Sequence, residues 1–274
     1  MPLCNMTDLM RAAEERSKAV GAFSVSSLEM IRGTVRAAEE MNTPVILQVA
    51  QVRLPHAPLY LLGSAMLTAA RHARVPVAVH LDHGVALPCI REALEMGFTS
   101  VMFDGSSLPL EENMQTTRRV IAMARPYGAS VEAEIGVIGK TEGGQERAAV
   151  CASVEDSLRF LKETGVDALA VAIGNAHGVY TGAPKLHFDI LAAIRRQDRT
   201  PLVLHGGTGI SDEDFRRCIE NGVRKINIAT AAYGAVYEAA RNASDYFHMS
   251  DRMEEAACQV AKRHIGVFGA FSLS

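Results

Sequence analysis

Short apolar runs rich in β-branched residues recur along almost the whole chain and alternate with longer segments of helical periodicity. Runs of this kind, apolar on both faces, are typical of parallel strands buried under layers of helices. The predicted strands span residues 21–25, 44–49, 76–81, 100–103, 130–133, 168–173, 201–204 and 224–228.

The segments between these strands repeat apolar residues at helical spacing. Pro58 and Pro88 suit a first helical position, where the missing N–H costs nothing. Ser211, followed three residues later by Asp214, resembles a capping box. The predicted helices span residues 27–41, 58–73, 88–97, 110–127, 154–165, 188–196 and 211–222.

Eight strands that alternate with helices over 274 residues predict an α/β fold, a (β/α)8 TIM barrel. A doubly wound open sheet is the alternative, but no GxGxxG motif follows the first strand. No linker, low-complexity stretch or repeat divides the chain. We therefore predict a single domain over residues 1–274, with a C-terminal helical tail from about residue 235.

The composition of the chain indicates which partners it can bind and in which compartment it works. Lys and Arg total 28 and Asp and Glu total 31, a net charge of −3, so no basic excess is present to bind nucleic acid or an anionic membrane. No apolar run approaches a membrane span, and Asp8 and Arg11 lie where a signal peptide would be apolar. The five cysteines form no CxxC motif. We expect a cytoplasmic protein.

Polar and ionisable residues gather at the carboxyl ends of the third to eighth predicted strands, the edge at which barrels of this fold build their active sites. Three of them, His83, His177 and His205, come from separate strands. Each alone could be structural, but three imidazoles converging with a position left open are typical of a catalytic Zn²⁺ site, one ion per subunit. Such an ion acts as a Lewis acid toward a carbonyl and stabilises an enediolate. We expect His80 to fill a layer of the barrel.

Acidic residues surround these histidines. Asp82 precedes His83, and strand alternation directs the two side chains apart. A carboxylate beside a metal that it does not bind is suited to proton transfer with a substrate hydroxyl. The alternative is a carboxylate that orients a ligand imidazole. Asp104 and Glu134 are candidates for that orienting role or for an alternate metal position.

Two loops have the character of phosphate sites. Gly206, Gly207 and Thr208 bring backbone N–H groups and a hydroxyl to the end of the seventh strand, and Asn227 and Thr230 add donors after the eighth. A plain tight turn is the alternative for the first loop. A further glycine-rich segment, residues 136–147, is either a surface connection or a lid that closes over substrate.

Five strings carry a family resemblance. HLDHG (80–84), SVEAEIG (130–136), AVAIGNAHGVY (170–180), PLVLHGGTGIS (201–211) and KINIAT (225–230) resemble the class II, zinc-dependent ketose-bisphosphate aldolases. The resemblance runs in order from about residue 20 to about residue 235. Ala229 stands where fructose-bisphosphate enzymes often have aspartate, and in this it looks more like the tagatose-bisphosphate branch.

The resemblance implies a role for each matching residue. His83, His177 and His205 would bind zinc, with Glu134 near the metal and Asp104 behind it. Asp82 would exchange the proton of the C4 hydroxyl, and Glu142 in the lid would take the proton from dihydroxyacetone phosphate. Residues that would hold the C1 phosphate are Gly178, Gly206, Gly207, Thr208, Asn227 and Thr230. A monovalent cation (Na⁺ or K⁺) near Gly178 and Gly206, and a homodimer or homotetramer, are further family features.

Several positions depart from the family pattern, and all of them lie on the substrate side. They are Ser24, Gly143, Gly144, Thr181 and Ala229. We therefore predict a zinc-dependent aldolase that cleaves a ketose 1,6-bisphosphate of tagatose or fructose type, or a related ketose 1-phosphate, to dihydroxyacetone phosphate and an aldehyde. The alternatives are a Schiff-base aldolase using Lys225, a metal-dependent hydrolase, and a catalytically idle homologue that binds a sugar phosphate.

Overall fold

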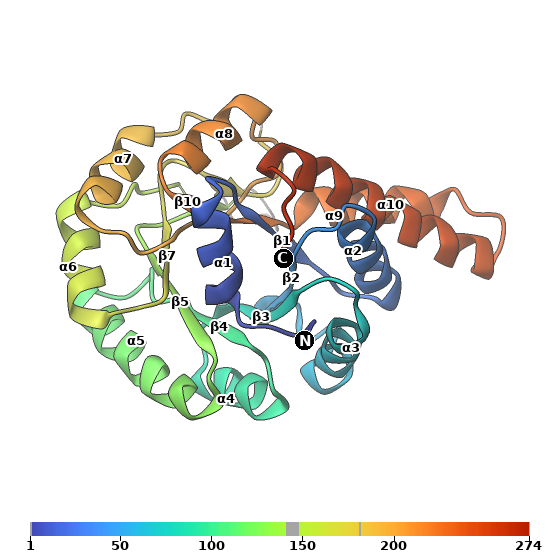
Figure 1. Cartoon of the computed structure of the whole chain (residues 1–274), viewed down its shortest axis with the longest axis horizontal. Coiled ribbons are helices and arrows are strands. Elements are labelled where there is room, and N and C mark those ends of the chain that lie inside the picture. The colour runs from blue at the N-terminus through green and yellow to red at the C-terminus, as the bar shows by residue number, and fades with distance from the viewer. Residues whose placement is uncertain (1, 141–147, 181, 274) are drawn as a thin grey trace.

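The computed structural model describes residues 2–140, 148–180 and 182–273. Eight parallel strands form a closed barrel (Figure 1). Around the barrel the order is β1-β10-β9-β7-β5-β4-β3-β2. The predicted (β/α)8 barrel is confirmed, and the open sheet is wrong. The strands are β1 (Val20–Ser24), β2 (Val45–Ala50), β3 (Val77–Gly84), β4 (Ser100–Phe103), β5 (Ser130–Ile135), β7 (Ala168–Val171), β9 (Leu202–Leu204) and β10 (Val223–Ile228). A separate short pair, β6 (Gly139–Lys140) and β8 (Ala176–His177), lies outside the barrel sheet.

Helices surround the barrel at the predicted places (Figure 1). The Ser211 hydroxyl accepts a hydrogen bond from the Asp214 N–H at 3.1 Å, so the predicted cap is present. Pro58 precedes its helix as the N-cap instead of starting it, because its ψ of 140° is extended. The helices are α2 (Leu28–Glu40), α3 (Leu59–His72), α4 (Leu87–Met96), α5 (Leu110–Ala124), α6 (Val154–Thr164), α7 (Phe188–Gln197), α8 (Asp212–Glu220), α9 (Thr230–Arg241) and α10 (Tyr246–Phe268), with one-turn helices η1 (Gln51–Arg53) and η2 (Arg125–Tyr127).

A helix that the strand and helix pattern did not predict, α1 (Met6–Glu15), closes the amino-terminal end of the barrel (Figure 1). Its fully buried Met6, Leu9 and Met10 belong to the same apolar cluster as Ala22 of β1 and Ala78 of β3. Small side chains inside the barrel leave room for these long ones. With the amino-terminal end closed in this way, the carboxyl ends of the strands are left as the place for a site.

The C-terminal part is helical: α9 runs across residue 235 and α10 follows it (Figure 1). Helices α2 and α10 approach closely at Gly33. A Cβ added there would lie 2.3 Å from the Glu254 carbonyl oxygen, so only glycine permits this approach. Glu254 also pairs with Arg36 at 2.9 Å. Among the described residues, no helix combines the length and the apolar character that crossing a membrane requires.

His264 is a buried titratable group of α10. It lies against the rings of Phe23, Phe215 and Phe268, with centroids 6.4, 6.3 and 5.9 Å away. Burial lowers the pKa of His264 below its ordinary value, and the neighbouring Arg263 acts in the same direction. The folded chain therefore holds this imidazole neutral.

We expect stability to depend on His264 below neutral pH. Above the unfolded pKa of about 6.5 the ring is neutral in both states. As the pH falls below that value, the unfolded chain takes up a proton that the folded chain resists, so stability is lost. The free energy of unfolding should fall less steeply from pH 7 to pH 5 in His264→Leu than in the wild type, measured by urea denaturation. An exposed control, His72→Leu, should keep the wild-type slope; equal slopes in all three proteins would contradict the prediction.

Candidate active site

A cavity of about 760 Å³ opens at the carboxyl ends of the barrel strands. Its walls include Asp82, His83, Asp104 and His177, and His205 lies fully buried behind them. These residues come from strands that are distant in sequence, so closure of the barrel is what assembles them.

The three histidines predicted as metal ligands converge. One ring nitrogen from each of His83, His177 and His205 lies within 4.8 Å of the others. The ring centroids of His83 and His205 are 4.6 Å apart, and those of His83 and His177 are 4.8 Å apart. Three imidazole nitrogens at this spacing suit a divalent transition metal such as zinc.

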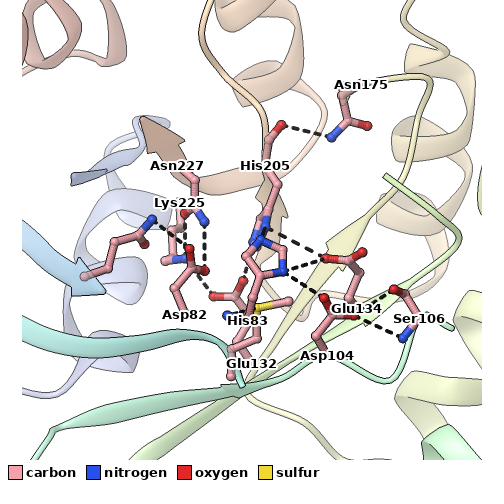
Figure 2. A network of polar contacts seen from close by, with 12 residues as sticks. Asp82, His83, Asp104, Ser106, Glu132, Glu134, Asn175, His205, Lys225 and Asn227 are labelled. Atoms are coloured by element: carbon pink, nitrogen blue, oxygen red, sulfur yellow. Dashed lines mark hydrogen bonds and ion pairs between the residues drawn. The ribbon is translucent and has the colours of Figure 1, made fainter. Parts of the chain in front are cut away.

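Acidic partners fix which nitrogen carries a proton in two of the rings, those of His83 and His205 (Figure 2). His83 Nδ1 donates to Asp104 Oδ2 at 2.8 Å, and His205 Nε2 donates to Glu132 Oε1 at 2.7 Å. A neutral imidazole has one N–H, so the other nitrogens, His83 Nε2 and His205 Nδ1, carry lone pairs. These two nitrogens face each other at 2.9 Å. Two lone pairs at that distance require a positive charge, which supports the fit of a metal ion.

The electrostatics of the site also favour a cation. Burial alone would lower the pKa of His83, but the charges of Asp82, Asp104 and Glu134 raise it to about 10. Burial and the charge on His83 lower the pKa of His205. Burial, reinforced by Asp104, raises the pKa of Glu134, whose buried Oε2 has no hydrogen-bond partner among the described residues. Without metal, a proton on His83 supplies the positive charge between the rings.

Asp82 faces the same cavity as His83, contrary to the expectation from strand alternation. The backbone of His83 has a φ of +44°, and the pairing of β3 with β4 shifts register between Leu81 and Gly84. The strand is no longer regular at this point, so both side chains reach the site. Asp82 is 4 % exposed and accepts from Asn227 Nδ2 at 3.1 Å and from Gln48 Nε2 at 3.2 Å.

The residues predicted to hold a phosphate all line this cavity: Gly178, Gly206, Gly207, Thr208, Asn227 and Thr230. Helix α9 starts here at Thr230, and the dipole at its N-terminus favours an anion. The Ala231 N–H of its first turn donates to the Thr208 hydroxyl at 3.0 Å, which ties the helix start to the Gly206–Thr208 loop. Asn227 differs from the expectation, because its amide is engaged by Lys225 and Asp82.

Tyr180 joins the two loops that line this part of the cavity. Its hydroxyl donates to the Gly206 carbonyl at 3.0 Å and accepts from the Ala176 N–H at 2.9 Å. A Cβ at Gly206 would lie 2.2 Å from the Ala176 carbonyl oxygen, so glycine permits this close approach.

The described residues do not cover every predicted position. Glu142, Gly143, Gly144 and Thr181 lie outside them. Ser24 and Ala229 line the cavity, so two of the departures from the family pattern face the substrate. His80 lies inside the barrel as expected, fully buried, with Nδ1 2.9 Å from the Ser100 hydroxyl.

Four residues contribute to the site in ways that the sequence did not predict: Gln48, Arg53, Glu132 and Lys225, the last of which was considered only as a Schiff-base nucleophile. Gln48 is a polar residue within an otherwise apolar buried strand, Lys225 lies in the fully buried strand β10, and Glu132 shares a strand face with Glu134. A polar residue in a strand buried on both faces is the signal that could have found three of them. Arg53 lies in a connection, where sequence gives no direction for its side chain.

Comparison with known proteins agrees with this geometry. The family model described as "Fructose-bisphosphate aldolase class-II" matches residues 4–272. A 6-phospho-5-dehydro-2-deoxy-D-gluconate aldolase of Shouchella clausii is 40% identical, with 86% of this chain and 82% of the relative covered. A fructose-bisphosphate aldolase of Staphylococcus aureus is 39% identical, with coverage of 88% and 86%.

Solved structures give the same result. The YdjI aldolase of Escherichia coli K12 is similar with a TM-score of 0.88 and 31% identity, over 98% of both chains. The barrel, with histidine, carboxylate and phosphate-loop residues at one edge, matches the class of enzyme that these relatives represent. The chain belongs to the class-II fructose-bisphosphate aldolase family and is a lyase that acts on phosphorylated sugars.

We expect the histidine cluster to take up metal. The chelator-treated chain should bind one Zn²⁺ per chain and gain thermal stability, because the ion binds only the folded state. His205→Ala should lose this uptake at micromolar Zn²⁺, whereas His72→Ala, on the outer face of α3, should keep it. Isothermal titration calorimetry measures both. Unchanged uptake by His205→Ala would place the metal elsewhere.

Proposed function

We propose that the chain is a zinc-dependent aldolase that reversibly cleaves the C3–C4 bond of a ketose 1-phosphate or 1,6-bisphosphate, releasing dihydroxyacetone phosphate and an aldehyde. The observation that carries the proposal is the meeting of the three histidines, Asp82 and the phosphate loops in one cavity. His83, His177 and His205 would hold the ion. A bound zinc ion supplies Lewis acidity, which stabilises negative charge on the substrate oxygens.

The residues of the chain handle the protons. Asp82 takes the C4 hydroxyl proton; the C4–O bond becomes the aldehyde carbonyl as the C3–C4 bonding electrons move to C3. Glu142 returns a proton to C3, which gives dihydroxyacetone phosphate and balances the reaction. The phosphate of the part of the substrate that becomes dihydroxyacetone phosphate would lie at the Gly206–Thr208 loop and at the start of α9, because a helix N-terminus favours an anion.

The alternatives gain less support. Lys225 Nζ lies 2.9 Å from Glu132 in an ion pair, and an ammonium has no lone pair with which to attack a ketone. Lys225 is also not among the described residues that line the cavity. An idle sugar-phosphate-binding homologue would have no use for a buried Asp82 held by two donors beside the histidines.

The far end of the substrate would be anionic as well. Arg53 is the one Lys or Arg among the described residues lining the cavity, and its guanidinium carbon lies 5.5 Å from the ring centroid of Tyr233. The phosphate loops account for one anionic end. The substrates named for the relatives, fructose bisphosphate and a 6-phosphogluconate derivative, carry an anionic group at each end. We propose that Arg53 binds the second one, as in a tagatose- or fructose-type bisphosphate.

Arg53→Gln tests this specificity in the condensation direction. With dihydroxyacetone phosphate fixed, KM for glyceraldehyde 3-phosphate should rise about 10- to 100-fold, the equivalent of one or two charge-assisted hydrogen bonds. KM for uncharged glyceraldehyde should not change. Arg241→Gln is the matched control, because Arg241 lies over the ring of another tyrosine, Tyr237; it should change neither KM. An equal rise in KM for dihydroxyacetone phosphate would assign Arg53 to the shared phosphate instead.

Two variants separate the proton steps. Asp82→Ala should lower kcat for cleavage about 10²- to 10⁴-fold with zinc still bound, but should leave solvent proton exchange at C3 of dihydroxyacetone phosphate. Glu142→Ala should mainly slow that exchange. Deuterium incorporation followed by NMR measures the exchange. A mild effect of Asp82→Ala would return Asp82 to an orienting role, and unchanged exchange would remove Glu142 from its role.

Other features stay predictions from the resemblance. They are a monovalent cation near Gly178 and Gly206, a homodimer or homotetramer, and a cytoplasmic location. Sedimentation of the purified chain tests the assembly, and the dependence of activity on K⁺ and Na⁺ tests the cation.

A further inference from the structure

A fully buried ion pair crosses the interior of the barrel beneath the histidine cluster (Figure 2). Lys225 Nζ of β10 lies 2.9 Å from Glu132 Oε2 of β5, and both side chains are 0 % exposed. Strands β10 and β5 are not neighbours in the sheet, so the contact spans the barrel. Burying two charges is costly unless further hydrogen bonds satisfy them. Where those further bonds go shows what the pair does.

Glu132 uses its other oxygen on a predicted metal ligand. Oε1 lies 2.7 Å from His205 Nε2, and a carboxylate only accepts hydrogen bonds. The proton of His205 therefore stays on Nε2, and the lone pair stays on Nδ1, the nitrogen that faces His83. The ammonium of Lys225 balances the charge of the carboxylate that performs this task.

Besides its ion pair with Glu132, Lys225 makes a hydrogen bond to Asn227. Nζ donates to Asn227 Oδ1 at 2.7 Å, and an ammonium cannot accept. The carbonyl end of the amide is thereby held at Lys225, so the NH₂ end must point the other way, to Asp82 Oδ1 at 3.1 Å. Gln48 donates to the other carboxylate oxygen. Asp82 is held as an acceptor on both oxygens, in one orientation (Figure 2).

We propose that the Glu132–Lys225 pair is a positioning device that serves both halves of the site: Glu132 fixes the tautomer of His205 and Lys225 fixes the amide of Asn227 against Asp82. Neither residue is among the described residues that line the cavity, so both act through others. The activity readouts rest on the proposed aldol cleavage, whereas the metal and NMR readouts do not.

Lys225→Met keeps the length of the side chain and removes the donor. At saturating Zn²⁺, kcat for cleavage should fall about 10- to 100-fold, the usual effect of losing such a supporting contact, while KM stays within threefold. Proton exchange at C3 of dihydroxyacetone phosphate does not use Asp82 and should be retained. Lys262→Met, which breaks the ion pair with Glu40 outside the barrel, is the matched control and should change none of these.

A second variant guards against misfolding by an unpaired buried carboxylate. Glu132→Gln/Lys225→Met removes both charges, so its core stays neutral. Its affinity for Zn²⁺ should fall about 10- to 100-fold. In the metal-free protein, ¹⁵N NMR of the wild type should show His205 protonated on Nε2, and the double variant should lose that preference.

The outcomes decide between the proposals. Wild-type kcat in Lys225→Met, or equal loss of cleavage and exchange, would overturn the Lys225 role. Wild-type zinc affinity and an unchanged His205 tautomer in the double variant would overturn the Glu132 role. A wild-type protein that binds zinc but cleaves no ketose phosphate would refute the proposed function, and the tautomer and affinity measurements would still test the positioning device.

Discussion

The facing lone pairs of His83 and His205 are the constraint on which the rest of the site depends. Asp104 and Glu132 hold the protons of the two rings on their outer nitrogens, which leaves two acceptors 2.9 Å apart. Only a positive charge makes this arrangement favourable. The surrounding carboxylates also favour a positive charge at this position, since they raise the pKa of His83 to about 10. A metal ion satisfies it permanently and leaves the imidazoles neutral.

The barrel assembles the groups that create this constraint. Helix α1 and the small residues around it close one end, while the irregular end of β3 turns both Asp82 and His83 toward the other. A positive φ at His83 is strain located where catalysis needs two adjacent side chains on one side. The buried pair of Glu132 and Lys225 connects His205, a proposed metal ligand, to the proposed base through Asn227. The proposed metal site and the proposed base thus share one buried network.

The strands of the barrel and the position of the histidines could be predicted from the sequence. The apolar runs gave the strands within a few residues, since strands buried on both faces leave a clear pattern, and the rule that barrel sites lie at carboxyl ends located the histidines. Helix α1 was missed although Met6, Leu9 and Met10 have helical spacing. Contacts across the barrel, such as Lys225 with Glu132, depend on how strands far apart in sequence are staggered. The direction of Asp82 depends on one backbone angle, which alternation cannot foresee.

The most direct test of this account is the position of a bound metal. A crystal structure of the zinc-loaded protein, with anomalous scattering to identify the ion, should show one zinc bonded to Nε2 of His83, Nδ1 of His205 and a ring nitrogen of His177. Asp104 and Glu132 should remain hydrogen-bonded to the opposite nitrogens. Zinc bonded through His83 Nδ1 or His205 Nε2, or located away from the three histidines, would contradict it.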